Sequence, residues 1–346
     1  MKTLLGRYAA HKYLTGRFLS FIEDRGIPRL LAPLRGFTFE DVASILEREL
    51  GYALNDRVRI RMVKVLIDFL RECGSVTEEE DRYLWNNGCF VRDGLSADES
   101  EVAKEFFRGQ VDFFEHCLLH ADEFLRGGLP LYSFDNEAAQ IWEDFLGNTE
   151  FNFARSVLAK VMLSGSDEDA RVLDLCYGPG FDILSIQECS SRVRVTALDF
   201  KDIFRGRALG RVPNPEAVCW IGSERWGGFG SVLPFPSETF DAVFFACADP
   251  YIAEQSRKFV YADIFRVIKS GGSLNILSHC YPDPEARFVE NIWVRRGTLC
   301  HDFAESVCEG WQGFCSASES VNLFESIGFK VGTVMMNSSI WRLDKP

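Results

Sequence analysis

From residue 171 onward, the sequence alternates short apolar runs with glycine turns and helix-length segments. The runs are RVLDLCYGPG, RVRVTALDF, FDAVFFACAD and GGSLNILSH, which begin at residues 171, 192, 240 and 271. Uninterrupted apolar runs of this length are typical of strands that are covered on both faces, as in parallel sheets. This half of the chain therefore predicts an α/β fold, a parallel sheet between two layers of helices.

The first run ends in an acid and a glycine loop, Asp174-Leu175-Cys176-Tyr177-Gly178-Pro179-Gly180. In an open parallel sheet, ligands bind beyond the carboxyl ends of the strands, near this first strand-to-helix turn. Glycines let the backbone approach a ligand closely, because no Cβ atom is in the way. The loop lacks the P-loop pattern and the full dinucleotide fingerprint, and Asp174 would repel a pyrophosphate. The pattern instead favours a cationic ligand.

A second acid, Asp199, ends the next strand-like run. A carboxylate at this place accepts hydrogen bonds from ribose hydroxyls. Either acid alone is a weak signal, because aspartate near a strand end also caps helices. Acids at the ends of two successive strands together favour a nucleoside cofactor with a positively charged tail.

These motifs, in their order along the chain, resemble those of the class I S-adenosylmethionine-dependent methyltransferases. VLDLCYGPG, ALDF, LPFPSETFDAVFF and FRVIKSGGSLNIL carry the resemblance, which covers roughly residues 165–335. It implies a Rossmann-like seven-stranded domain with S-adenosyl-L-methionine as cofactor. The glycine loop would hold the methionine part, Asp199 the ribose, and the segment around 220–224 would flank the adenine. The cofactor-binding residues expected on this basis are Asp174, Tyr177, Gly178, Gly180, Asp199, Phe200 and Ser223.

The first 90 residues predict two helices and a hairpin. Residues 36–51 and 55–74 carry amphipathic stripes behind the expected N-caps Thr38 and Asn55, and SVTEEEDRYLWNNG predicts a hairpin with its turn at Asn87-Gly88. Two helices and a two-stranded wing outline a winged helix. With the linker that follows, this resembles the small-molecule O-methyltransferases and their C-methylating relatives. The resemblance implies a winged-helix-like dimerisation domain over 1–98, a helical linker contributing to the acceptor pocket over 99–164, and a cofactor-binding catalytic domain over 165–346.

Charge and composition limit the partners. The formal net charge of −13 argues against nucleic acid or an anionic membrane as the main partner. The N-terminal sequence is unlike a secretory signal and no transmembrane run is present, so we expect a cytoplasmic protein. The resemblance implies a homodimer that acts on a small molecule. The cysteines form no C-x-x-C pair, and His116 and His120, spaced for a metal on one helix face, are interpreted as residues of a packed or half-exposed face. No metal is expected.

The sequence departs from the resemblance at two places. Cys176 stands where the family has the first glycine of the loop. The O-methyltransferases carry a His-Asp pair after the fourth strand, and counting from Asp241 to KSGG places Pro250 and Tyr251 there. Since proline cannot act as a general base, we expect catalysis mainly by in-line placement of the reactants.

Three side chains are the candidate catalytic groups: Tyr251, His279 and His301. The acceptor is expected to be a small aromatic or conjugated molecule, methylated on oxygen or carbon. The glycine-rich, aromatic stretch WGGFG at 226–230 is consistent with a lid over such a substrate. Two alternatives stay open: a non-methylating enzyme on the same fold, and a winged-helix regulator that senses a ligand. Residues 1–72, with 13 Lys/Arg against 9 Asp/Glu, permit DNA contact in the second case.

Overall fold

The computed structural model describes residues 2–34, 36–80, 82–86, 97–164, 169–281, 292–336 and 338–346. The chain forms two compact units. The first unit comprises Met1–Ser133 and Val289–Trp311, and the second comprises Phe134–Phe288 and Gln312–Pro346. The linker expected over 99–164 is thus divided between the two units, and one late segment joins the first unit.

The second unit is built on a seven-stranded sheet. Its strands are β3 (Arg171–Leu175), β4 (Arg194–Leu198), β5 (Cys219–Ile221), β6 (Phe240–Ala246), β7 (Ile268–Leu277), β8 (Lys330–Met335) and β9 (Ile340–Asp344). They lie in the order β5-β4-β3-β6-β7-β9-β8. The first five are parallel, and β9 runs antiparallel to both β7 and β8. The predicted Rossmann-like seven-stranded fold is confirmed.

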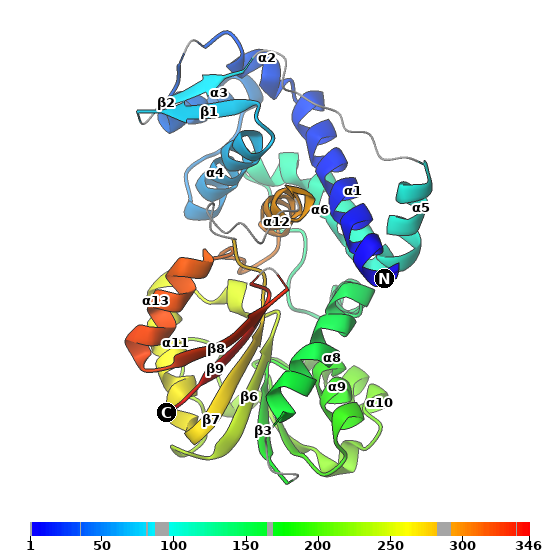
Figure 1. Cartoon of the computed structure of the whole chain (residues 1–346). Helices are drawn as coiled ribbons and strands as arrows, with labels where there is room; N and C mark the ends of the chain where they lie inside the picture. Colours follow the sequence, from blue (N-terminus) through cyan, green and yellow to red (C-terminus); the bar gives the residue numbers. More distant parts are fainter. Residues whose placement is uncertain are drawn as a thin grey trace. The chain divides into compact units, whose positions relative to one another are not determined.

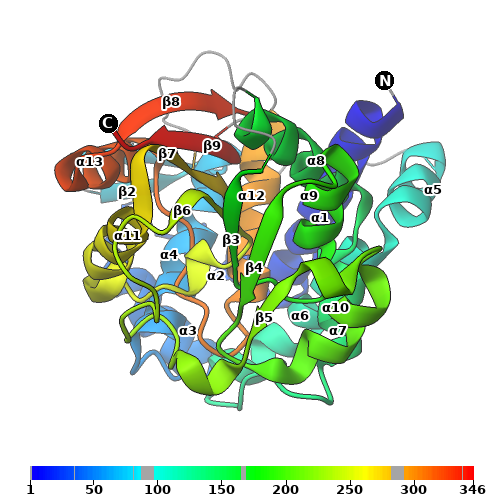
Figure 2. The same ribbon diagram turned by 90° about the horizontal axis from the view of Figure 1, so that it is seen from below.

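Helices cover both faces of this sheet (Figures 1 and 2). One layer contains α8 (Thr149–Leu163), α9 (Phe181–Cys189) and α10 (Arg205–Arg211), and the other contains α11 (Glu254–Val267) and α13 (Ala317–Ile327). Successive strand side chains point to opposite faces. Thus Val172 packs in the core beneath α8 and α9, whereas Leu173 and Leu175 pack in the core beneath α11. Shorter elements are α7 (Ala139–Leu146), η1 (Asp202–Phe204), η2 (Pro215–Ala217), η3 (Ser223–Arg225) and η4 (Asp249–Tyr251).

The first unit is mainly helical. It contains α1 (Lys2–Asp24), α2 (Ile27–Leu31), α3 (Phe39–Leu50), α4 (Arg57–Glu72), β1 (Val76–Glu79), β2 (Arg82–Trp85), α5 (Ala97–Phe106), α6 (Arg108–Leu125) and α12 (Ile292–Glu305). The ring centroid of Phe18 lies 4.6 Å from that of Phe69 and 4.4 Å from that of Phe303. Its core therefore joins α1, α4 and α12, although α12 comes from far along the chain.

The two predicted helices and the hairpin are present, with two corrections. Thr38 caps α3 in a capping box with Asp41, as expected, but the cap of α4 is Asp56 rather than Asn55. The hairpin turns between Glu79 and Arg82, and Asn87-Gly88 lies outside the described residues. A bridge between Phe37 and Tyr83 adds a third extended segment to the hairpin. The name winged helix stays a prediction.

None of the described helices is both long enough and apolar enough to span a membrane.

Candidate functional site

The glycine loop follows β3 and leads into α9. Gly178 and Gly180 have φ angles of 47° and 87°, in the left-handed region that favours glycine. A Cβ atom on Gly180 would lie 2.9 Å from the Cα of Ala208, so this glycine also lets α10 approach. Cys176, at the position of the family's first glycine, has a φ of 63°, and its amide donates to the carbonyl of Leu198 at 2.7 Å. The loop is thus fixed against the end of β4.

Asp174, on β3, is fully buried at the start of this loop. In the part of the chain that the structure describes, neither of its carboxylate oxygens has a hydrogen-bond partner. Burial first, and then the nearby carboxylates of Asp182 and Asp199, raise the pKa of Asp174 well above its usual value, and Arg155 lowers it by less. A buried polar group without a partner is rare in proteins and calls for an explanation, such as a missing ligand.

Asp182, in the first turn of α9, is paired with a buried arginine. Arg155 on α8 donates its Nε to Asp182, its Nη1 to the carbonyl of Leu146 at 2.6 Å, and its Nη2 to Cys247 Sγ at 3.8 Å. Arg155 is only 3% exposed. The sequence analysis did not single it out, but a signal was present: it is a lone charge in the apolar stretch FNFARSVLA.

Asp199 follows β4 and accepts three backbone hydrogen bonds. The donors are the amides of Gly178 at 3.0 Å, Phe200 at 2.8 Å and Lys201 at 3.5 Å. Burial raises the pKa of Asp199 to about 6, and these amides oppose the increase. An ionised carboxylate accepts about four hydrogen bonds, so Asp199 links the glycine loop to β4 and retains capacity for a hydroxyl donor.

The remaining expected cofactor residues lie near the same strand ends. The ring of Tyr177 meets that of Trp220, in β5, edge-on at 5.3 Å, and among the described residues nothing bonds the buried hydroxyl of Tyr177. Ser223 Oγ donates to Asp202 at 3.1 Å, which places it beside the segment after β4. Phe200 packs edge-on against Trp226. These residues surround the carboxyl ends of β3, β4 and β5.

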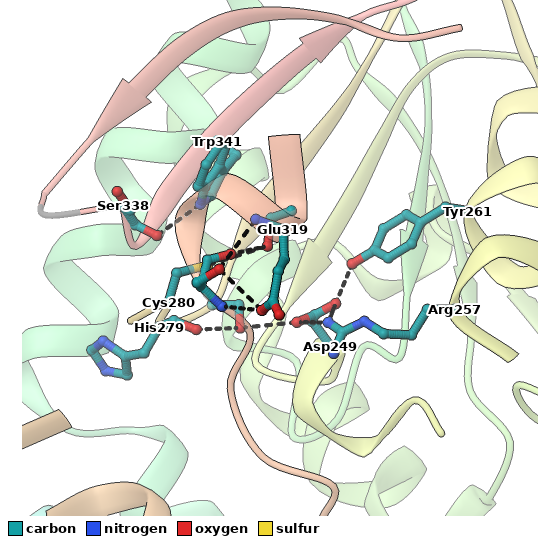
Figure 3. Close-up of polar contacts among 11 residues, drawn as sticks. Asp249, Arg257, Tyr261, His279, Cys280, Glu319, Ser338 and Trp341 are labelled. Atoms are coloured by element: carbon teal, nitrogen blue, oxygen red, sulfur yellow. Dashed lines mark hydrogen bonds and ion pairs between the residues drawn. The ribbon is translucent and has the colours of Figure 1, made fainter. Parts of the chain in front are cut away.

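After β6 the chain carries a further buried aspartate, Asp249, in a closed network. Its carboxylate forms an ion pair with Arg257 and accepts from the hydroxyl of Tyr261, and Ser278 Oγ lies at 3.5 Å (Figure 3). Burial first, and then Asp249, raise the pKa of Tyr261 well above its usual value. Pro250, next in η4, is buried as well.

The three candidate catalytic residues have different surroundings. Tyr251 packs edge-on against Phe134 at 5.1 Å. His279 is buried, and its Nδ1 lies 3.1 Å from Ser339 Oγ, with the imidazole pointing away from Asp249 (Figure 3). His301 belongs to the first unit, on α12, where its Nε2 lies 2.5 Å from Glu305 Oε2. Their catalytic roles stay predictions.

Among the described residues, no three or more His, Cys, Asp or Glu side chains gather as metal ligands would. His116 Nδ1 lies 3.1 Å from the hydroxyl of Tyr132, and His120 Nε2 lies 2.8 Å from the carbonyl of Leu129. The two histidines on α6 therefore contact separate protein groups. His116 is exposed and His120 is partly buried, so neither lies in the core.

The aromatic stretch at 226–230 is packed by its own rings. Trp226 is 3% exposed and donates its Nε1 to the carbonyl of Ser231 at 3.3 Å. Phe229 meets the rings of Trp226 and Phe245 edge-on. A small cavity lies here, lined by Leu175, Trp226, Phe229, Ser231, Leu233, Val260, Asp263 and Ile264. Movement of this stretch as a lid stays a prediction.

A comparison with protein-family models identifies the domain that is built on the seven-stranded sheet. Residues 173–276 match the family model described as "Methyltransferase domain", an interval that contains the glycine loop and both strand-end acids. The second unit carries a methyltransferase domain. This domain has the motif order and the seven-stranded sheet that the class I S-adenosylmethionine-dependent methyltransferases share, which supports methyltransferase activity. A comparison with curated protein sequences gives no match.

Solved methyltransferase structures share the fold over nearly the whole chain. The DszA carbon methyltransferase is 15% identical with a TM-score of 0.62, over 98% of this chain and 90% of that one. An O-methyltransferase family 2 protein from Planctomyces limnophilus, in complex with apigenin, is 14% identical with a TM-score of 0.59, over 100% and 95%. An O-methyltransferase family protein from Burkholderia thailandensis is 14% identical with a TM-score of 0.55, over 96% and 94%.

The residues of the methyltransferase domain fit S-adenosylmethionine chemically. The cofactor carries a positively charged sulfonium, an ammonium, a carboxylate and two ribose hydroxyls. Asp174 is a buried acceptor with no partner among the described residues, Tyr177 brings a buried hydroxyl in the same condition, and Asp199 has capacity left for a hydroxyl. Gly178 and Gly180 have left-handed φ angles and no Cβ atom, so the backbone between these groups can approach a ligand closely.

Proposed function

We propose that this chain transfers the methyl group of S-adenosylmethionine to an oxygen or carbon atom of a small aromatic or conjugated acceptor. The observation that carries the proposal is the buried, unpartnered carboxylate of Asp174 beside a left-handed glycine loop, within a methyltransferase domain. The class of acceptor is proposed from the fold neighbour from Planctomyces limnophilus, which was solved in complex with apigenin, a flat conjugated molecule.

In the proposed cofactor site, the chain's own residues hold three parts of the molecule. Asp174 faces the positive charge, and the backbone from Tyr177 to Gly180 lies along the methionine part. Asp199 accepts from the ribose hydroxyls, while Phe200 and Ser223 border the nucleoside. Bound there, S-adenosylmethionine supplies an electrophilic methyl group with a good leaving group.

Proximity is the proposed source of catalysis. Pro250, in η4 after β6, has no group that accepts a proton, and neighbouring Asp249 is occupied by Arg257 and Tyr261. An acceptor that ionises readily, such as an acidic phenol or enol, needs little help from a base. Placement of its nucleophilic atom in line with the methyl group then supplies most of the rate enhancement. Tyr251, His279 and His301 remain the candidates for a base.

Calorimetric titration tests the cofactor site first. S-adenosylmethionine and S-adenosylhomocysteine should bind the wild type with micromolar affinity, about −8 kcal/mol, and Asp199→Ala should lose that binding. An acceptor screen read by mass spectrometry follows, in which the product gains the mass of one methylene group. Turnover of the cofactor without this mass gain would indicate a non-methylating reaction instead.

We also propose that the first unit serves dimerisation rather than DNA binding. The helix that would read DNA in a winged helix, α4, buries Met62, Val63, Val65, Leu66, Ile67, Phe69 and Leu70. Arg61 on the same helix is paired with Asp302. Sedimentation equilibrium should give a dimer mass, and a duplex DNA titration at low salt should show no binding. Salt-dependent DNA binding would instead favour the alternative that the chain is a winged-helix regulator that senses a ligand.

A further inference from the structure

Three buried carboxylates lie around the glycine loop, and their charges are compensated very differently. Asp182 has the guanidinium of Arg155, and Asp199 has three backbone amides. Asp174, fully buried, has neither a cation nor a hydrogen-bond donor on its oxygens in the described part of the chain. The three acids therefore differ in how easily each one carries a negative charge.

The groups that face Asp174 come from several elements. Asp182 on α9 and Asp199 after β4 are both acids, and the thiol of Cys176 lies within the same loop. Within the described residues, the cation that acts on Asp174 is Arg155 on α8, and it is already paired with Asp182. An ionised carboxylate in such a place costs many kcal/mol, and buried acids of this kind take up a proton instead. Burial and the two acids act on the pKa of Asp174 in that direction.

We propose that Asp174 is protonated in the cofactor-free enzyme and releases its proton when the positive charge of S-adenosylmethionine binds beside it. The inference rests on the proposed function, since it needs the cofactor in this site. The balance is simple: the carboxylic acid loses a proton to solvent, and the resulting carboxylate gains the cofactor's cation as its partner. Asp174 is then the residue that makes the site respond to the charge of its ligand.

A definite pH dependence follows. Binding requires the ionised acid, so affinity should rise about tenfold per pH unit while Asp174 of the free enzyme is protonated, and level off once it ionises. S-adenosylhomocysteine keeps the ammonium but lacks the sulfonium. Proton release with both ligands would make the ammonium the partner of Asp174, and release with S-adenosylmethionine alone would make it the sulfonium. Either result supports the proposal.

The test is calorimetry of S-adenosylmethionine binding, repeated at one pH in buffers with different ionisation enthalpies. The wild type should release about one proton per bound cofactor. Asp174→Asn keeps the shape of the protonated acid, so it should fold, bind more weakly, release no proton and lose the pH dependence. Asp241→Asn is the control, because Asp241 lies at the start of β6 and bonds Lys269 and the amide of Arg171. This control should release its proton as the wild type does.

The outcomes separate cleanly. Proton release that persists in Asp174→Asn would assign the proton to another group, such as Asp199, and overturn the proposal, as would tight wild-type binding with no release. Should Asp174→Asn bind too weakly for calorimetry, an infrared difference spectrum of the wild type must show the loss of a protonated carboxyl band on binding, and its absence overturns the proposal. Folded wild type that binds neither ligand would refute the proposed function instead.

Discussion

Two aspartates of the methyltransferase domain are both buried near the carboxyl ends of neighbouring strands, yet their surroundings are opposite. Asp249, after β6, is bonded by Arg257 and Tyr261, with the Ser278 hydroxyl close by. Asp174, on the adjacent strand β3, has no hydrogen-bond partner within the described residues. A saturated carboxylate fixes the backbone around it, whereas an unsaturated one lowers the stability of the protein until a ligand supplies the missing partner.

Removing the saturated acid should have the largest effect. Asp249→Ala leaves the guanidinium of Arg257 buried without its partner, which should lower the free energy of unfolding by about 3–5 kcal/mol. Chemical denaturation measures this loss. The matched control is Asp241→Ala, which breaks a half-exposed pair with Lys269 and should cost no more than about 1 kcal/mol. Equal losses in the two variants would mean that the Asp249 network does not stabilise the fold.

Replacing Asp174 should instead raise the free energy of unfolding of the cofactor-free protein. Asp174→Leu replaces a buried polar group that has no partner among the described residues with an apolar side chain of similar size. The cofactor-free protein should gain about 1–3 kcal/mol of stability, and cofactor binding should disappear. Thermal unfolding with and without S-adenosylmethionine shows both changes in one experiment. A destabilised variant would indicate that Asp174 has a structural partner after all.

Asp199 is intermediate between Asp249 and Asp174, because it accepts hydrogen bonds from backbone amides. Its ionisation should be visible in the pH dependence of the free energy of unfolding. Its pKa is raised to about 6 in the folded protein, so the protonated acid favours folding. That contribution is complete below the unfolded pKa of about 4 and is lost as the pH rises through 6, with a slope of at most about 1.4 kcal/mol per pH unit. Denaturation of cofactor-free Asp199→Asn across this range should show a flatter profile than that of the wild type. An unchanged profile would contradict the prediction.

The smallest effect concerns two cysteines with left-handed backbones. Cys176 after β3 and Cys247 after β6 have φ angles of 63° and 60°. Glycine at either place relieves the backbone strain but loses a packed thiol and gains freedom in the unfolded chain, so stability should change by no more than about 1 kcal/mol. Cofactor affinity should respond more to Cys176→Gly, because only Cys176 lies in the glycine loop. Titration of both variants compares the two positions.

The sequence predicts that the glycine loop and the two acids lie at the ends of strands, and their roles in binding stay predictions. The glycine loop with its two acids is a short-range pattern, and the alternation of strands and helices implies that their carboxyl ends meet. The partners of the buried charges could not be predicted, because Arg155 and Asp182 are 27 positions apart on different helices. A local turn signal also predicted the wrong position for the hairpin turn. The Asn87-Gly88 pair predicts the turn there, but the chain turns at Glu80, where φ is 47°. No local pattern indicates that α12 joins the first unit.

The position of α12 has a consequence for synthesis. The aromatic core of the first unit includes Phe18 of α1 and Phe303 of α12, so this core is incomplete until almost the whole chain exists. At about 5–20 residues per second, a nascent α1 waits roughly 15–50 s for α12, although α4 is made soon after it. During that interval the part of α1 that packs against α12 is available to chaperones, and a ribosome that stalls before residue 292 leaves the first unit unable to complete its core.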